Sequence, residues 1–407
     1  MIQSGDTAFV LISAALVLLM IPGLALFYGG MVRRKNVLGT IMQSLILISL
    51  VSFEWVYLGY SMSFGPDIHG LIGSLAWFGL GGVGTAPNPD YAGTIPQIAF
   101  AMYQCMFAAI TPALITGAVA ERMRFGPFLL FSLIWVVVVY NPVCHWVWGN
   151  GGWLKALGVL DFAGGLVVHL TCGAAALAAV LVMGARKDHG KHQIVPHNLP
   201  MTLLGTGLLW FGWFGFNSGS ALAANGVAAN AFAATHLGGM AGMAVWSVIE
   251  WWHRGKPTSL GAASGAVAGL ATITPGAGFV SPGSAVLIGM LAGGICYGAV
   301  LLKARLRFDD SLDVVGIHGV GGLIGTLLVG VLAAKAVNPA GADGLLAGNA
   351  AQLGIQALGV AAVGLYAFVA SWCIIRIVKA VMGLRLDPQA ETMGLDLSEH
   401  TESAYGE

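Results

Sequence analysis

The sequence predicts an all-α polytopic membrane protein with eleven transmembrane helices. Of its 407 residues, 57% are apolar and only 9% are charged, and the mean hydropathy is +0.82. A soluble domain carries about a quarter charged residues, so this chain lacks the polar surface that a globule in water needs. Sixty glycines are typical of membrane helices in close contact. The same composition excludes intrinsic disorder, and the net charge of zero indicates no surface for nucleic acid.

Eleven stretches meet the length requirement of a membrane helix, which is about 20 mostly apolar residues. They cover residues 7–32, 37–64, 95–120, 126–145, 161–184, 200–218, 227–252, 258–274, 283–304, 312–333 and 351–381. No positively charged segment precedes the first stretch, which we therefore interpret as a retained span and not as a cleaved signal peptide. Residues 1–382 then form one transmembrane domain, and residues 383–407 form a polar, acidic tail.

The basic residues predict the orientation of these spans. Only Lys155 and Lys335 fall in one set of alternating connections, and the other 16 of the 18 Lys and Arg residues fall in the other set, which includes the C-terminal end. Because cytoplasmic loops are enriched in basic residues, the N-terminus is expected outside and the C-terminus in the cytoplasm. The sequence thus predicts a multi-pass protein of the cell membrane.

Eleven spans divide into two halves of five and a final helix. Two five-span halves have opposite topology, which is the arrangement of inverted-repeat transporters. One detail supports this division: the fifth span contains Asp161 and His169, and the tenth contains Asp313 and His318. The spacings differ, at eight and five positions, so the correspondence is incomplete.

Ionisable residues inside a span usually face the protein interior or a cavity. His169 and His318 are flanked by glycines and occupy matched places in the two halves, so we expect them to line one pore; the alternative is two separate buried histidines. Asp161 and Asp313 begin their spans, where an acid favours capping of the helix N-terminus. Glu54 lies within the second span, and the sequence assigns it no role.

Aromatic residues gather near the predicted outer ends of several spans. Tyr103 and Phe107 lie on one helix face, Trp148 stands in a short loop, and Phe216 and Ser220 belong to the run WFGWFGFNSGS at 210–220. A belt at the membrane surface is one explanation. The other is a cage that binds a small cation through ring faces and one hydroxyl, without a fixed negative charge.

The sequence offers nothing that resembles an enzyme or a metal site. The five cysteines lie singly in apolar runs, and no zinc, nucleophile–base, Walker or dinucleotide pattern is present. We therefore expect no catalysis, no cofactor and no bound metal.

Long motifs along most of the chain resemble the ammonium transporters of the Amt/Mep/Rh superfamily, on the Amt branch. The carrying stretches are PGLALFYGGMVRRKNVL at 22–38, GYSMSFG at 59–65, AERMRF at 120–125, DFAGGLVVHLTCG at 161–173, PHNLP at 196–200, GWFGFNSGSALAAN at 212–225, SGAVAGLATITPGAGFV at 264–280, DVVGIHGVGG at 313–322 and GLRLDPQAETMGLDLSEH at 383–400. The resemblance implies eleven spans, the same orientation and a homotrimer with one pore per subunit. It also implies that PII-type signal proteins are candidate partners at the cytoplasmic face.

The resemblance implies roles for individual residues as well. An outer cation site falls on Trp148, Phe107, Tyr103 and Ser220, a gate on Phe107 and Phe216, the pore histidines on His169 and His318, and a buried structural acid on Asp161. Ammonium would bind outside, lose a proton near the gate and pass as ammonia, and the proton either stays outside or crosses separately along the histidines.

Two other functions stay open at this stage. One is a channel for another small neutral or amine species. The other is an ammonium sensor, which would need a signalling partner because a tail of about 25 residues is too short for an output domain.

Overall fold

The computed structural model describes residues 1–192 and 194–406, and a helix lies in each of the eleven expected ranges. Four of the helical segments contain one π-helical turn, labelled η2, η4, η5 or η7. The segments are α1 (Ser4–Met31); α2, η2 and α3 (Val37–Glu54, Trp55–Gly59, Tyr60–Phe64); α4 (Gln97–Val119); α5, η4 and α6 (Phe125–Trp135, Val136–Tyr140, Asn141–Trp148); η5 and α8 (Gly165–Leu170, Thr171–Met183); α9 (Leu199–Ser218); α10 (Gly226–Arg254); α11 (Ser259–Ile273); α12 (Pro282–Leu306); η7 and α13 (Val315–Gly319, Val320–Leu332); and α14 (Ala351–Met382).

Short elements connect the long helices. They are the 3-10 turns η1 (Arg34–Asn36), η3 (Leu75–Leu80), η6 (Gly219–Ala221) and η8 (Leu345–Ala347), the helix α7 (Trp153–Ala156), the antiparallel strands β1 (Asp67–Ile68) and β2 (Ile72–Gly73), and the tail helices α15 (Pro388–Met393) and α16 (Leu395–His400).

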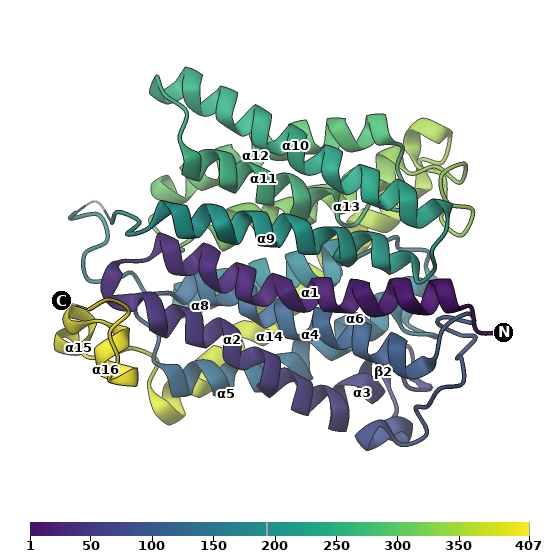
Figure 1. Cartoon of the computed structure of the whole chain (residues 1–407), viewed down its shortest axis with the longest axis horizontal. Coiled ribbons are helices and arrows are strands. Elements are labelled where there is room, and N and C mark those ends of the chain that lie inside the picture. Colours follow the sequence, from purple (N-terminus) through teal and green to yellow (C-terminus); the bar gives the residue numbers. More distant parts are fainter. Residues whose placement is uncertain (193, 407) are drawn as a thin grey trace.

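The long helices run roughly side by side in one bundle, with the N-terminus at one end and the C-terminus at the other (Figure 1). We call these ends the N-terminal face and the C-terminal face. In the described residues, ten helical segments are long and apolar enough to cross a membrane, and α11, with 15 residues, is a shorter apolar helix. The structure is therefore that of a multi-pass membrane protein, and a count of eleven spans stays a prediction.

The four helices α9 to α12 each begin with a side-chain cap. Asn198, Asn225, Thr258 and Ser281 each accept a hydrogen bond from the backbone N–H three residues later, at the starts of α9, α10, α11 and α12. These caps satisfy N–H groups that have no partner within the helix. The polar residues before these apolar runs therefore mark where the four helices begin.

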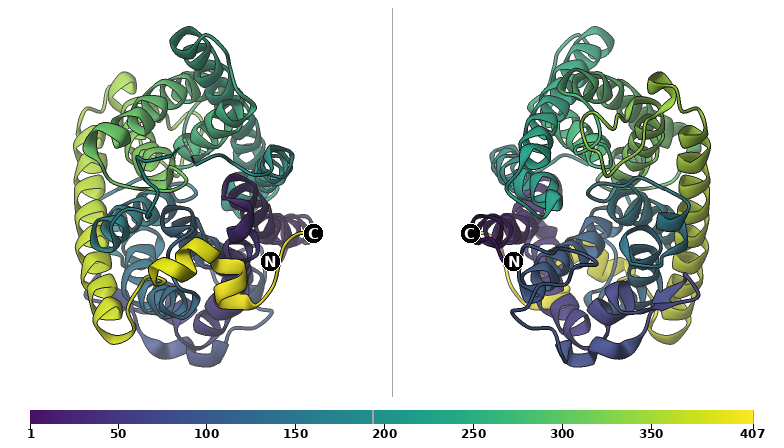
Figure 2. Two further views of the ribbon diagram at one scale, coloured as in Figure 1. Left: turned by 90° about the vertical axis from the view of Figure 1, so that its left-hand side faces the viewer. Right: turned by 90° about the vertical axis from the view of Figure 1, so that its right-hand side faces the viewer.

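Glycines let α8 and the turn η7 approach each other closely at the centre of the bundle. The Cα atoms of Gly173 in α8 and Gly319 in η7 face each other, so a Cβ on Gly173 would clash with the Gly319 backbone. α14 lies along the outside of the bundle and contacts α5 and α8 as well as α13 (Figure 2). The close approach of α8 and η7 brings the two histidine-bearing turns, η5 and η7, into contact.

The tail folds onto the C-terminal face, where α15 and α16 lie across the ends of the helices (Figure 2). Three of its acidic side chains accept hydrogen bonds from backbone N–H groups in the first turns of α2 and α5 and in the connection after α8. These bonds join Gly39 N to Asp396 Oδ1 (2.8 Å), Lys187 N to Glu391 Oε1 (2.9 Å) and Phe125 N to Glu399 Oε2 (2.8 Å). Hydrogen bonds to charged acceptors are stronger than neutral ones, so the acidic tail is held at several points.

A buried network of charged side chains lies on the same face. Glu121 accepts hydrogen bonds from Arg33 Nε (3.1 Å) and Arg186 Nη1 (2.8 Å), and Arg186 Nη2 also donates to Asp309 Oδ1 (2.8 Å). Burial alone would raise the pKa of the Glu121 carboxyl, but Arg186 and Arg33 hold it below its usual value. The network joins the connections that carry Arg33, Glu121 and Arg186 to the one that carries Asp309.

Candidate functional site

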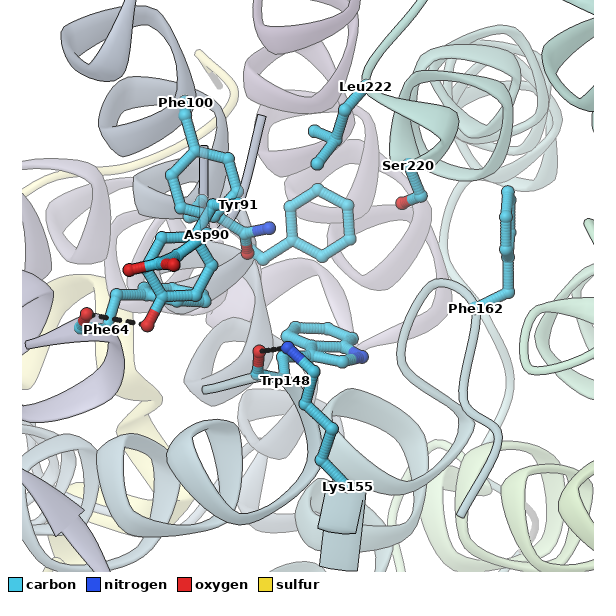
Figure 3. Close-up of a pocket in the computed structure, with 11 residues that line it drawn as sticks. Phe64, Asp90, Tyr91, Phe100, Trp148, Lys155, Phe162, Ser220 and Leu222 are labelled. Atoms are coloured by element: carbon cyan, nitrogen blue, oxygen red, sulfur yellow. Dashed lines mark hydrogen bonds between the residues drawn. The ribbon is translucent and has the colours of Figure 1, made fainter. Parts of the chain in front are cut away.

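A cavity of about 160 Å³ opens near the N-terminal face (Figure 3). Three of the four residues expected in an outer cation site line it: Phe107, Trp148 and Ser220. The sequence interpretation did not include its other lining residues, which are Phe64, Asp90, Tyr91, Phe100, Gln104, Lys155, Phe162 and Leu222. Asp90 and Lys155 make the mouth charged, which corrects the expectation of a purely aromatic site with one hydroxyl.

Trp148, the last residue of α6, is fixed by a hydrogen bond from its indole Nε1 to the Asp161 carbonyl oxygen at 2.7 Å. Its ring meets the Phe107 ring edge-on, with centroids 6.0 Å apart. A buried indole N–H needs an acceptor, and this one leaves the ring face free to border the cavity. Two aromatic walls of the cavity are thus set at right angles.

Tyr103 lies behind the wall of the cavity and does not line it. Its side chain is fully buried, and its hydroxyl lies 3.0 Å from the Gly215 carbonyl oxygen, 2.8 Å from the Phe216 carbonyl oxygen and 3.2 Å from Ser220 Oγ. This hydroxyl donates to carbonyl oxygens at the end of α9, so its contacts in this structure are with the protein and not with the cavity. In this structure Tyr103 supports Ser220, and its membership of the outer cation site stays a prediction.

Phe107 and Phe216 stack below the cavity. Their ring centroids are 4.2 Å apart, and the ring planes differ by 26°. Phe107 comes from α4 and Phe216 from α9, and both side chains are buried. The stacked pair separates the outer cavity, which Phe107 lines, from a second cavity lined by Phe216.

The second cavity is narrow and almost entirely apolar. Its volume of about 10 Å³ is close to the smallest space that holds one water-sized molecule. Two imidazoles are the only titratable side chains that line it within the described ranges. The lining residues are Met20, Leu24, Ile110, Leu114, Val168, His169, Leu209, Trp213, Phe216, Val267 and His318.

The structure brings His169 and His318 together in this cavity. Their Nδ1 atoms are 3.3 Å apart, and the rings are nearly parallel, with an interplanar angle of 23°. A bond between two Nδ1 atoms requires one ring to donate and the other to accept, so neutral imidazoles share one proton at this contact. Nε2 of His169 has no hydrogen-bond partner in the described part of the chain, which leaves a polar atom in an apolar cavity.

Asp161 holds the turn that carries His169. Its carboxylate accepts four backbone N–H bonds, all at the start of η5. They come from Gly164 (2.8 Å), Gly165 (2.7 Å), Leu166 (2.8 Å) and Val167 (3.2 Å). The side chain is therefore a helix cap, and its carbonyl oxygen also binds Trp148. One residue thus positions both the outer indole and the inner imidazole.

The second histidine has an equivalent cap, but Asp313 does not provide it. Asp313 forms an ion pair with Lys303, whereas Asp310 Oδ2 accepts the Val315 backbone N–H at 2.8 Å at the start of η7. The interpretation of Asp313 as the cap is therefore wrong. Asp310 precedes His318 by eight positions, as Asp161 precedes His169. This matched spacing is the sequence signal that the interpretation missed when it paired His318 with Asp313.

Glu54 is buried outside both cavities. Its Oε1 accepts a hydrogen bond from Asn141 Nδ2 at 2.8 Å, and its Oε2 has no partner in the described residues. Both residues adjoin a π-helical turn, η2 after Glu54 and η4 before Asn141. Glu54 lines neither cavity, so the site does not use it.

Comparisons with known proteins agree on one family. The family model described as "Ammonium Transporter Family" matches residues 8–405. The chain is 51% identical over 404 residues to "Ammonium transporter" of Bacillus subtilis, covering 99% of each chain, and 49% identical over 403 residues to "Ammonium transporter Amt1" of Archaeoglobus fulgidus, covering 99% and 100%. Among solved structures, Candida albicans Mep2 has a TM-score of 0.90 at 36% identity, covering 95% of this chain and 87% of that one. A structure named "Sensor Amt Protein" has the same TM-score at 31% identity, covering 97% and 98%.

Proposed function

The chain belongs to the ammonium transporter family, and from this premise we propose how it moves its substrate. Ammonium is bound at the outer cavity by the Trp148 and Phe107 rings and the Ser220 hydroxyl. It loses a proton near the stacked pair Phe107 and Phe216, and ammonia passes His169 and His318. The single observation that carries this proposal is the pair of facing imidazoles in a narrow apolar cavity directly below the aromatic mouth.

Electrostatics favours passage of the neutral molecule. Among the described residues, no carboxylate lines the inner cavity. Moving an ion of this size from water into a dry site costs on the order of 20 kcal/mol in the idealised limit. Ammonia carries no net charge and fits a cavity sized for one small molecule. Imidazole nitrogens can donate to it and accept from it, and they can take part in proton transfer. The released proton either stays outside or crosses along the two histidines.

The orientation and assembly belong to the same proposal. The basic residues favour an external N-terminal face and a cytoplasmic C-terminal face in the cell membrane, with residues 1–382 as the transmembrane domain and 383–407 as the tail. The matched pairs Asp161–His169 and Asp310–His318 favour an inverted repeat of five spans and a final helix. We propose a homotrimer with one pore per subunit, nitrogen uptake as its role, and a PII-type protein as a candidate partner at the C-terminal face.

The transport proposal is tested with purified protein in proteoliposomes, by recording ammonium uptake and electrical current together. Uptake without current is the expected result if the proton stays outside, and current in proportion to uptake is expected if it crosses separately. Absence of ammonium-dependent uptake from correctly inserted protein would contradict the function.

The sensor named above is less similar to this chain than the transporters, at 31% against 51% identity, so transport is the function that the comparisons favour.

Trp148→Leu is expected to weaken ammonium capture. The change removes one aromatic wall and its hydrogen bond to Asp161, and a single cation–π contact contributes about 0.5–2 kcal/mol. The concentration of ammonium that gives half-maximal uptake should therefore rise about two- to thirtyfold. Trp252→Leu, which alters an exposed indole at the C-terminal end of α10, is the matched control. Wild-type affinity for ammonium in the Trp148 variant would favour the other explanation, in which the aromatic residues form a belt at the membrane surface.

Removal of residues 383–407 is expected to change the transport rate without preventing insertion. Through Asp396, Glu399 and Glu391 the tail binds the starts of α2 and α5 and the connection after α8, so its loss frees all three at once. The variant is compared with wild type for uptake rate, membrane insertion and the thermal stability of the oligomer. A truncated protein with full activity and unaltered oligomer stability would show that the tail is passive.

A further inference from the structure

Two charged side chains line the outer cavity and have no part in the mechanism above. Asp90 lies in the long connection before α4, and Lys155 lies on the short helix α7. Figure 3 shows Lys155 reaching from α7 to Trp148, and Asp90 beside Tyr91 on another side of the same cavity. In the described residues these two groups form no ion pair with each other, but Asp90 is near enough for its charge to oppose part of the lowering of the Lys155 pKa by burial. Both charges therefore border the same cavity.

Lys155 is held at the mouth by the same kinds of contact that a bound ammonium ion would make. Its Nζ donates to the Trp148 carbonyl oxygen at 3.0 Å and lies 5.8 Å from the centroid of the Tyr91 ring. The first contact is a charge-assisted hydrogen bond, and the second is a cation–π contact. The side chain therefore places a tethered primary ammonium group at the edge of the site proposed for the free ion.

We propose that Lys155 and Asp90 set the affinity of the outer cavity for ammonium, Lys155 by lowering it and Asp90 by raising it. This inference rests on the proposed outer cation site. A second positive charge within one cavity raises the free energy of the bound cation, and a carboxylate in the same cavity lowers it. The affinity of the outer cavity for ammonium thus depends on the aromatic rings and on two opposing charges, those of Lys155 and Asp90.

The opposed charges have a consequence that a purely aromatic site would not have. Interactions between charges near water are screened over about 10 Å at an ionic strength of 0.1 M. The effect of Lys155 and of Asp90 on ammonium affinity should therefore shrink as salt is added, whereas the aromatic contribution should change little. The same side chains should act alike on methylammonium, because the interaction depends on charge.

The experiment measures half-maximal ammonium concentration for uptake into proteoliposomes at low and high ionic strength. Lys155→Gln removes the charge and keeps a hydrogen-bond donor, and at low salt we expect it to lower this concentration about three- to tenfold. Asp90→Asn is expected to raise it by a similar factor. Lys155→Arg keeps the charge and should stay near wild type. Lys335→Gln is the matched control, because this exposed lysine belongs to the same set of connections and does not line the cavity.

Two results would overturn the inference. One is a wild-type half-maximal concentration in Lys155→Gln at low salt. The other is an equal change in Lys155→Gln and Lys155→Arg that persists at high salt, which would make Lys155 a support for the Trp148 backbone and not a charge at the mouth. Trp148→Leu, measured in parallel, separates this inference from the proposed function. If Trp148→Leu changes the half-maximal ammonium concentration and the Lys155 variants do not, the outer cation site stands and only the proposed role of Lys155 is wrong.

Discussion

Asp161→Ala is expected to leave little folded protein, because four backbone N–H groups at the start of η5 lose their acceptor together. Each buried donor left without a partner costs about 1–3 kcal/mol, and water has little access to this position. The sum approaches the whole stability of an ordinary domain, which is about 5–15 kcal/mol. The yield of monodisperse protein in detergent is therefore expected to fall at least about tenfold, and the thermal unfolding midpoint of the remainder should drop.

A matched control shows whether the loss of stability comes from the burial of the capped N–H groups or from the loss of any cap. Asp387 caps α15 by accepting two backbone N–H groups, from Gln389 and Ala390, but it is exposed. Water can replace its carboxylate, so Asp387→Ala should keep a nearly wild-type yield and midpoint. Asp161→Asn retains one side-chain oxygen and should fall between the two alanine variants. If Asp161→Ala purified and unfolded like wild type, the carboxylate would have no structural role.

The positions of the long helices followed from hydropathy because a span in lipid must be apolar and must satisfy its own backbone groups. The ends were less predictable where polar residues are paired inside the protein. The fourth span was expected to end at 145, but α6 continues to Trp148. His145 does not mark a surface, because its ring lies 3.0 Å from the Ser63 carbonyl oxygen and 2.9 Å from Asp67 Oδ1.

The site was partly predictable for a related reason. His169 and His318 were recognised because ionisable residues are rare inside spans, and Phe107 and Phe216 because the motifs were long. The role of the Tyr103 hydroxyl depends on the end of α9, which lies more than a hundred residues away in sequence, and no local pattern reveals it. Asp90 and Lys155 come from connections, where charged residues are ordinary, so only the folded structure places them at the mouth.

Replacement of the pore histidines is expected to change transport far more than folding. His169→Ala removes the ring that faces His318 and leaves an apolar gap. Ammonia then loses a polar contact, and a proton that crosses along the histidines loses its route. Proton transfer by a positioned side chain contributes about 10²–10⁴-fold to a rate. We therefore expect ammonium uptake to fall at least about tenfold. His318→Glu places an acid in the cavity, and it should admit K⁺, measured as a K⁺ current absent from wild type.

His236→Ala provides the comparison, because this histidine also lies in a long helix, α10. The centroid of its ring is 5.6 Å from that of the Trp210 ring. It lines neither cavity, so its loss should leave uptake and ion selectivity unchanged. All three variants are first compared by thermal unfolding, since a change in transport counts only for protein that is folded. Wild-type uptake and selectivity in both pore variants would place the path of ammonia elsewhere, because the 3.3 Å contact of the two Nδ1 atoms cannot survive either change.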